Sequence, residues 1–150
     1  MGSEEPVRRV IEWDEFDELV SSIASQIPDE ESPHAIVGLT RGGLVPAVRL
    51  SHMYNAKLFC LNISLRDGMV DDSEFDWDLL DDYTRVLIVD DINDSGKTFN
   101  TVLDECYHHL IPGAKFCALL EKETSSFKTA YSGEVINKGQ EKDWIVFPWE

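Results

Sequence analysis

Short apolar runs that alternate with helical stretches constrain the fold of this chain more than any other feature. Two helices are predicted between or after these runs, over Leu44–Tyr54 and Lys97–Leu110. Strands that alternate with helices predict an α/β fold, with a mostly parallel sheet flanked by helices and ligands beyond the carboxyl ends of the strands. The four runs, each as long as a buried strand, are Ala35–Leu39, Lys57–Ile63, Arg85–Val89 and Ala114–Leu120.

Two further elements complete the predicted fold. In Trp13–Ile27 the apolar residues recur every three or four positions, which predicts an amphipathic helix, and Asp14 is placed to cap its N-terminus. The stretch Trp144–Phe147 predicts a short last strand. No repeat, low-complexity tract or flexible linker divides the chain, so we expect a single domain over residues 1–150.

Charge and cysteine usage exclude several classes of function. The chain has 29 acidic against 13 basic residues and a formal net charge of −16, which argues against nucleic acid or an anionic membrane as a partner. No apolar run reaches the roughly 18 residues of a membrane span, and the start MGSEEPVRR lacks the apolar core of a secretory signal. Three cysteines without C-x-x-C spacing argue against a disulfide framework and for a reducing, cytoplasmic location.

The segment VLIVDDINDSGKT carries the most information about function. Its apolar strand is followed by two adjacent acids, Asp90 and Asp91, and by a loop of small residues that leads into a helix. The helix N-terminus and the hydroxyls of Ser95 and Thr98 would form a phosphate cradle that needs no net charge. The two acids would accept hydrogen bonds from vicinal hydroxyls or hold a hard divalent cation. A ribose 5-phosphate carries both groups and is therefore the natural ligand.

Three other interpretations of this segment compete. Asp91, Asn93 and Ser95 imitate the first half of an EF-hand loop, but Val102 stands where calcium requires a glutamate. The run Gly96-Lys97-Thr98 imitates the end of a P-loop, but Asp91 stands where the first glycine is needed. The third interpretation is a solvated acidic turn that caps a helix, although two acids after a buried strand are costly without a role.

The same segment resembles the phosphoribosyl-diphosphate signature of type I phosphoribosyltransferases, and Ser95 stands where threonine is commoner in that family. The resemblance implies the type I phosphoribosyltransferase fold with a small C-terminal base-binding hood. It also implies that Asp90 and Asp91 hold the ribose hydroxyls and that Asp91 contacts Mg²⁺. The loop that would bind the 5-phosphate comprises Asp94, Ser95, Gly96, Lys97 and Thr98.

A second segment, IVGLTRGGLVPA, resembles the pyrophosphate loop of the same family, in its bacterial xanthine–guanine and hypoxanthine branch. Two glycines, Gly42 and Gly43, would let backbone amides approach a phosphate closely. Arg41 adds a forked donor, and the following helix adds its dipole. Taken alone, such a sequence is also typical of a simple turn.

The C-terminal part of the chain resembles the base-binding region of that branch. The resemblance implies that Lys122 contacts the purine 6-oxo group, that Trp144 stacks on the base, and that Ile145 offers backbone contacts. An ammonium donor suits an oxo purine and disfavours the amino group of adenine. The competing interpretation is that Trp144 and Phe147 are core aromatics and that Lys122 is a surface lysine.

The stretch of residues 66–82 departs from the family pattern. Its position matches the family's mobile lid, but it holds eight acids and one base, Arg66, the single candidate cation for the leaving group. An acidic lid of this kind would either attract magnesium or stay solvated and mobile, and we favour the second. The resemblance places the base-binding hood mainly over residues 121–150.

The activity implied by the resemblance is transfer of a 5-phosphoribosyl group from phosphoribosyl diphosphate to guanine, xanthine or hypoxanthine in purine salvage, with release of pyrophosphate. Asp94 would accept or relay the proton of the purine five-membered ring. The alternatives are a transferase for adenine, orotate or another nitrogen acceptor, and a catalytically silent regulator that binds phosphoribosyl diphosphate or a nucleotide. Family analogy predicts a homodimer or homotetramer whose partners are these small molecules.

Overall fold

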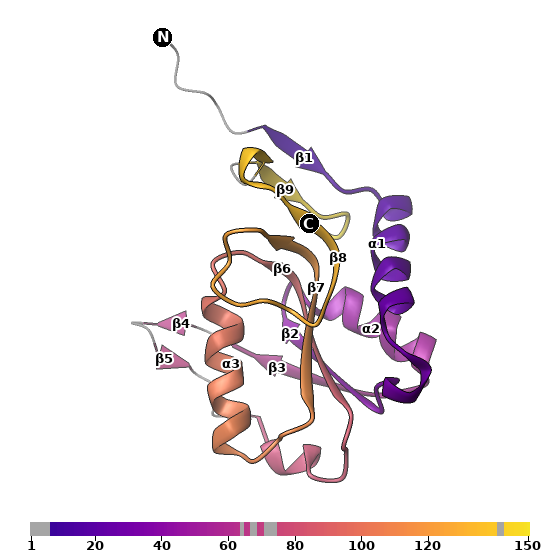
Figure 1. Cartoon of the computed structure of the whole chain (residues 1–150), viewed down its shortest axis with the longest axis vertical. Coiled ribbons are helices and arrows are strands. Elements are labelled where there is room, and N and C mark those ends of the chain that lie inside the picture. Colours follow the sequence, from indigo (N-terminus) through magenta and orange to yellow (C-terminus); the bar gives the residue numbers. More distant parts are fainter. Residues whose placement is uncertain (1–6, 64, 67–68, 71–74, 141–142) are drawn as a thin grey trace.

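Five parallel strands form the central sheet, in the order β3-β2-β6-β7-β8 (Figure 1). The computed structural model describes residues 7–63, 65–66, 69–70, 75–140 and 143–150. The strands are β1 (Arg8–Val10), β2 (Ala35–Thr40), β3 (Lys57–Asn62), β4 (Leu65–Arg66), β5 (Met69–Val70), β6 (Val86–Asn93), β7 (Ala114–Lys122), β8 (Tyr131–Ile136) and β9 (Trp144–Val146). The α-helices are α1 (Trp13–Gln26), α2 (Leu44–Tyr54) and α3 (Lys97–His108), and 3₁₀ turns span Asp29–Glu31, Trp77–Leu80 and Lys138–Gln140.

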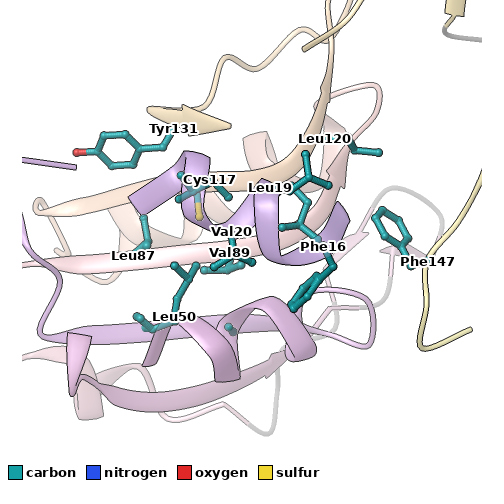
Figure 2. Packing of buried hydrophobic residues seen from close by; sticks show 14 of the residues in the cluster. Phe16, Leu19, Val20, Leu50, Leu87, Val89, Cys117, Leu120, Tyr131 and Phe147 are labelled. Atoms are coloured by element: carbon teal, nitrogen blue, oxygen red, sulfur yellow. The ribbon is translucent and has the colours of Figure 1, made fainter. Parts of the chain in front are cut away.

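Helices cover both faces of the central sheet, so both faces are apolar. Leu87 and Val89 of β6 pack in the same cluster as buried residues of α1 and α2, and several of these side chains are drawn in Figure 2. Val86 and Ile88 point to the other face, where they join a cluster with buried residues of α3. Alternate residues at the start of β6 therefore serve two cores, which explains why its first four residues are all apolar.

The sheet confirms the predicted α/β fold and extends it in three places. Strand β6 continues to Asn93 and β7 to Lys122, because the parallel pairing runs on as far as Asn93 opposite Glu121. Strand β8, which was not predicted, pairs with β7 at the edge of the sheet. Its exposed and half-buried residues give a weak apolar pattern, which is typical of an edge strand.

The start of α1 differs from the sequence-based prediction. The helix begins at Trp13, so the N-cap position falls at Glu12, which makes no side-chain capping bond. Asp14 lies in the first turn instead, where its charge complements the helix dipole. Within the described part of the chain, no helix has both the length and the apolar character needed to cross a membrane.

The two ends of the described chain meet in a second, two-stranded sheet. Strand β1 pairs in parallel with β9, with Arg8 opposite Trp144 and Val10 opposite Val146, beside the carboxyl edge of the central sheet (Figure 1). The backbone amide of Trp144 also donates to the carbonyl of Val7 at 2.8 Å. The residues that were expected to bind the base therefore depend on the N-terminal segment for their position.

Candidate functional site

The two acids of the VLIVDDINDSGKT segment lie at the end of β6, and both are half-buried. The amide of Asp91 donates to Asp90 Oδ1 at 2.9 Å, and the amide of Ile92 donates to Asp91 Oδ1 at 2.7 Å. Burial, followed by the adjacent charge of Asp91, raises the pKa of Asp90 well above its ordinary value, and burial also raises the pKa of Asp91. A cation or a pair of hydroxyl donors beside these carboxylates would offset the cost of burying them.

The segment after β2 lies directly against this acid pair. Around Gly42 and Gly43 the loop is so close to β6 that side chains would not fit. A Cβ on Gly42 would lie 2.2 Å from Asp91 Oδ2, and one on Gly43 would lie 2.3 Å from the carbonyl oxygen of Val89. The exposed Arg41 precedes both glycines, after a cis Thr40–Arg41 peptide bond. The loop expected to hold pyrophosphate and the acids expected to hold ribose are therefore neighbours.

A small cradle lies between β6 and α3. It has a volume of about 50 Å³, and residues 90 and 92–99 line it. Gly96 takes the N-cap position with φ of 91°, a left-handed conformation that favours glycine, and Ser95 Oγ accepts from the amide of Lys97 at 3.3 Å. The structure thus places Ser95, Gly96, Lys97 and Thr98 at a helix N-terminus, the arrangement that binds phosphate through backbone amides.

An ion pair joins two residues that the sequence assigned to different roles. Lys122 Nζ lies 2.8 Å from Asp94 Oδ1, and the Lys122 side chain is 19% exposed whereas that of Asp94 is 66% exposed. Lys122 is therefore not a free surface lysine, and its ammonium group is held over the loop that carries Asp94. The ion pair places Lys122, the expected donor to the purine 6-oxo group, next to Asp94, the expected proton acceptor.

A pocket of about 380 Å³ opens beside this ion pair. Trp144 is 69% exposed and lines it, whereas Phe147 is buried in the core, so only one of the two aromatics behaves as a core residue. Four acids and one lysine give the pocket a polar wall. The lining residues are Asp91, Ile92, Asp94, Lys122, Asp143, Trp144, Ile145, Phe147 and Glu150.

A hard divalent cation would bind here to one or two carboxylates and would complete its coordination with substrate oxygens and water. Among the described residues, no group of three or more His, Cys, Asp or Glu side chains is arranged to hold a metal ion. Magnesium in phosphate sites uses one or two carboxylates together with substrate oxygens and water. The half-buried pair Asp90 and Asp91, with Asp91 Oδ2 against the Gly42 loop, suits that mode of binding and does not form an all-protein cage.

The segment predicted to be a lid is described only in part. Arg66 lies in β4, which pairs antiparallel with β5. The structure describes the backbone of Arg66 but not the placement of its side chain. Asp67, Asp71, Asp72 and Glu74 lie outside the described residues. Farther along, Trp77 and Leu80 are buried against the core on the α3 side, so the last part of residues 66–82 packs against the domain.

Sequence reasoning missed a buried polar cluster behind the phosphate cradle. Its members are Asn93, Glu121, Ser125 and Thr129, and they come from β6, the end of β7 and the loop that follows β7. A signal was present, because Asn93 and Glu121 both continue apolar strands with a polar side chain. Pattern reading attributed that polarity to the ends of the strands.

Residues 12–150 match the model of the phosphoribosyl transferase domain family. A xanthine-guanine phosphoribosyltransferase of Cereibacter sphaeroides is 30% identical over 93% of this chain and 85% of its own length, and that of Roseobacter denitrificans is 29% identical over 93% and 84%. A purine phosphoribosyltransferase from Pyrococcus horikoshii superimposes with a TM-score of 0.75 and 28% identity, covering 95% of this chain and 94% of that one.

Proposed function

Because the chain belongs to the phosphoribosyl transferase family, we propose that it transfers the 5-phosphoribosyl group of phosphoribosyl diphosphate to a 6-oxopurine. The base is guanine, xanthine or hypoxanthine, the product is the purine ribonucleotide, and pyrophosphate leaves. The observation that carries the proposal is the Lys122–Asp94 ion pair at the mouth of the pocket that Trp144 lines. Relatives named for xanthine and guanine support the same choice of base.

In this proposal the donor substrate spans two loops. The 5-phosphate lies in the cradle at the α3 N-terminus, and the ribose hydroxyls lie against Asp90 and Asp91. The pyrophosphate lies over Gly42 and Gly43, where the backbone is bare of side chains, and Arg41 is exposed nearby to neutralise it. Asp91 stands between the two halves, because its Oδ2 atom faces Gly42.

Recognition of the base uses opposite charges in one pocket. Lys122 donates to the 6-oxo oxygen, which rejects adenine because an ammonium and an amino group are both donors. Trp144 stacks on the ring, and its exposure leaves a free face for the base. The half-buried Ile145 supplies backbone groups to the edge of the ring. The base-binding hood then comprises β9, its partner β1 and the end of β7.

The reaction depends on loss of pyrophosphate from the anomeric carbon. A magnesium ion, which Asp91 and Asp90 would hold, supplies charge neutralisation for the leaving group. Asp94 accepts the proton of the purine five-membered ring, and the Lys122 ammonium group beside it holds the carboxylate in position. The chain contributes mainly by fixing donor and acceptor side by side and by stabilising charge.

Two finer features complete the proposal. In the proposal the first part of residues 66–82 serves as the lid over the pyrophosphate, and much of that part lies outside the described residues. Trp77 and Leu80, toward the other end of the stretch, are buried in the core. Arg66 would face the leaving group from that lid. The active protein is a homodimer or homotetramer, which sedimentation of the purified chain measures directly.

The decisive experiment offers phosphoribosyl diphosphate with a panel of bases at saturating magnesium and measures pyrophosphate release. We expect multiple turnovers with at least one of guanine, xanthine and hypoxanthine, and none with adenine or orotate. Turnover with adenine or orotate alone would assign the alternative transferase activity. Tight binding of phosphoribosyl diphosphate without turnover on any base would instead identify a regulator.

A further inference from the structure

A buried hydrogen-bond cluster lies directly behind the phosphate cradle. Among the described residues, the buried polar or charged side chains are Ser51, Asn93, Glu121 and Ser125, and three of these four belong to this one cluster. Such a concentration of polar groups in an otherwise apolar interior costs free energy unless every bond is satisfied. Packing of the sheet alone does not explain why these polar side chains are buried here.

Asn93 is the centre of the cluster, and both hydrogen-bonding atoms of its side chain have partners. Its Nδ2 atom donates to Glu121 Oε1 at 2.8 Å and to the carbonyl oxygen of Phe127 at 2.7 Å, and its Oδ1 atom accepts from Ser125 Oγ at 2.8 Å. Glu121 Oε1 also accepts from the amide and the hydroxyl of Thr129, each at 2.8 Å. These bonds fix residues 125–129, hereafter the brace, against the end of β6.

The brace contacts the phosphate loop, residues 94–98, directly. Both the amide and the hydroxyl of Ser126 donate to the carbonyl oxygen of Ser95, at 2.9 and 2.8 Å. Asn100 of α3 donates to Ser126 Oγ at 3.0 Å. The contact leaves no space at Gly96, where a Cβ would lie 2.5 Å from the amide nitrogen of Phe127. The backbone that forms the cradle thus lies directly on the brace.

We propose that Asn93 and Glu121 are positioning residues that hold the phosphate loop, through the brace, in its phosphate-binding conformation. This inference rests on the proposed function, since it assigns the 5-phosphate to that loop. Asn93 lines the cradle, but its side chain is buried and bonded to protein partners, as is that of Glu121, so neither side chain contacts the substrate in this scheme. Asn93 precedes Asp94 and Glu121 precedes Lys122. The hydrogen bond between Asn93 and Glu121 therefore also sets the register of the two residues that form the ion pair at the base pocket.

A purely structural role and a positioning role predict different results. A structural cluster, once weakened, lowers thermal stability and leaves ligand affinities unchanged below the melting transition. A positioning cluster weakens binding of the 5-phosphate selectively and leaves binding of pyrophosphate intact, because Gly42 and Gly43 of the pyrophosphate loop are packed on other residues. Ribose 5-phosphate and pyrophosphate, each titrated calorimetrically with magnesium, report on the two loops separately.

The test variants are Asn93→Leu, which removes the central amide at similar volume, and Ser125→Ala, which removes one hydroxyl and keeps the test open if the first variant does not fold. Glu121→Gln is the conservative rescue, because its amide oxygen can accept the same three bonds. Ile23→Ala is the matched control, since Ile23 is a fully buried residue of the other core cluster, on the α1 side of the sheet.

We expect Asn93→Leu to weaken ribose 5-phosphate binding by about tenfold or more and Ser125→Ala by a smaller factor, because each leaves buried partners unpaired. Pyrophosphate affinity stays within about twofold in both variants, and Glu121→Gln and Ile23→Ala bind ribose 5-phosphate as the wild type does. Unchanged ribose 5-phosphate affinity in folded Asn93→Leu and Ser125→Ala, with wild-type turnover intact, would overturn the positioning role alone. Failure of the wild type to bind ribose 5-phosphate or release pyrophosphate would overturn the proposed function and this inference with it.

Discussion

Replacing Gly42 by alanine tests how closely the pyrophosphate loop is fitted to the acid pair. The added methyl carbon would lie 2.2 Å from Asp91 Oδ2, whereas ordinary contacts of a Cβ begin at 3.4 Å. The carboxylate cannot swing away freely, because Asp91 Oδ1 accepts from the amide of Ile92 at 2.7 Å. Either the acid or the loop must therefore move by about 1 Å from its position in the site.

A displacement of this size has a predictable kinetic cost. Misplacing a reacting group by about 1 Å costs on the order of 100-fold in rate, which corresponds to about 2.7 kcal/mol of transition-state stabilisation. Gly42 does not have a positive φ, so alanine is compatible with the backbone itself, and we expect the overlap with Asp91 to lower the unfolding free energy by about 1–3 kcal/mol, the usual cost of overpacking. The predicted effect is thus a large loss of kcat/KM for phosphoribosyl diphosphate in a stably folded protein.

The assay is steady-state pyrophosphate release with the preferred base at saturating magnesium. Gly139→Ala is the matched control, because among the described residues a Cβ at Gly139 meets only Asn137 Oδ1, at an ordinary 3.4 Å. We expect this control to retain wild-type kinetics. A Gly42→Ala protein that unfolds like the wild type and keeps kcat/KM within about threefold would refute the reasoning, because Asp91 would then tolerate the displacement.

Four further predictions concern other side chains. Asp94→Asn lowers kcat by about 100-fold or more, because it removes a proton acceptor, and weakens phosphoribosyl diphosphate binding much less. Initial rates measure the first effect and calorimetry the second. An unchanged kcat would show that the role of Asp94 is misassigned. Trp144→Ala raises KM for the base by about tenfold with little change in melting temperature, because the exposed indole contributes a stacking face; an unaltered KM would contradict this. A thiol reagent at neutral pH labels the exposed Cys60 first, because Cys106 and Cys117 are buried; equal labelling rates would oppose this. Burial raises the pKa of the Cys106 thiol from 9.0 to about 12. Between these two pH values the native state holds a proton that the unfolded state has released, so we expect the free energy of unfolding, measured in denaturant melts, to fall as pH rises through this range.

The central architecture was readable from the sequence because it depends on local patterns. Apolar patterns predicted α1, α2, α3 and four strands of the sheet, and the order of strands and helices placed the polar residues that follow them at one edge. The positions of Asp90, Gly42 and Gly96 followed from motif chemistry for the same reason. The structure places all three around one edge of the sheet, as that order implies.

The elements that sequence reasoning missed depend on contacts between distant segments. Strands β1 and β8 are short or mixed in polarity, and their pairing partners rather than their own pattern make them strands. The ion pair between Lys122 and Asp94 was equally invisible, because the two residues were assigned separate roles on separate strand ends. The brace escaped notice since its loop has no periodic pattern and gains meaning only when folded against Asn93.

The pairing of β1 with β9 affects the order in which the two halves of the site form and open. Arg9 of β1 donates to Glu134, 125 positions along the chain, at 2.6 Å, so the wall that carries Trp144 is complete only after a very long loop has closed. The part of the site that binds the 5-phosphate is assembled from segments between β6 and β8, which are near one another in sequence. We expect the amides of β1 and β9 to exchange with deuterium before those of β6 and β7. Local unfolding of this wall would admit the purine while phosphoribosyl diphosphate stays bound.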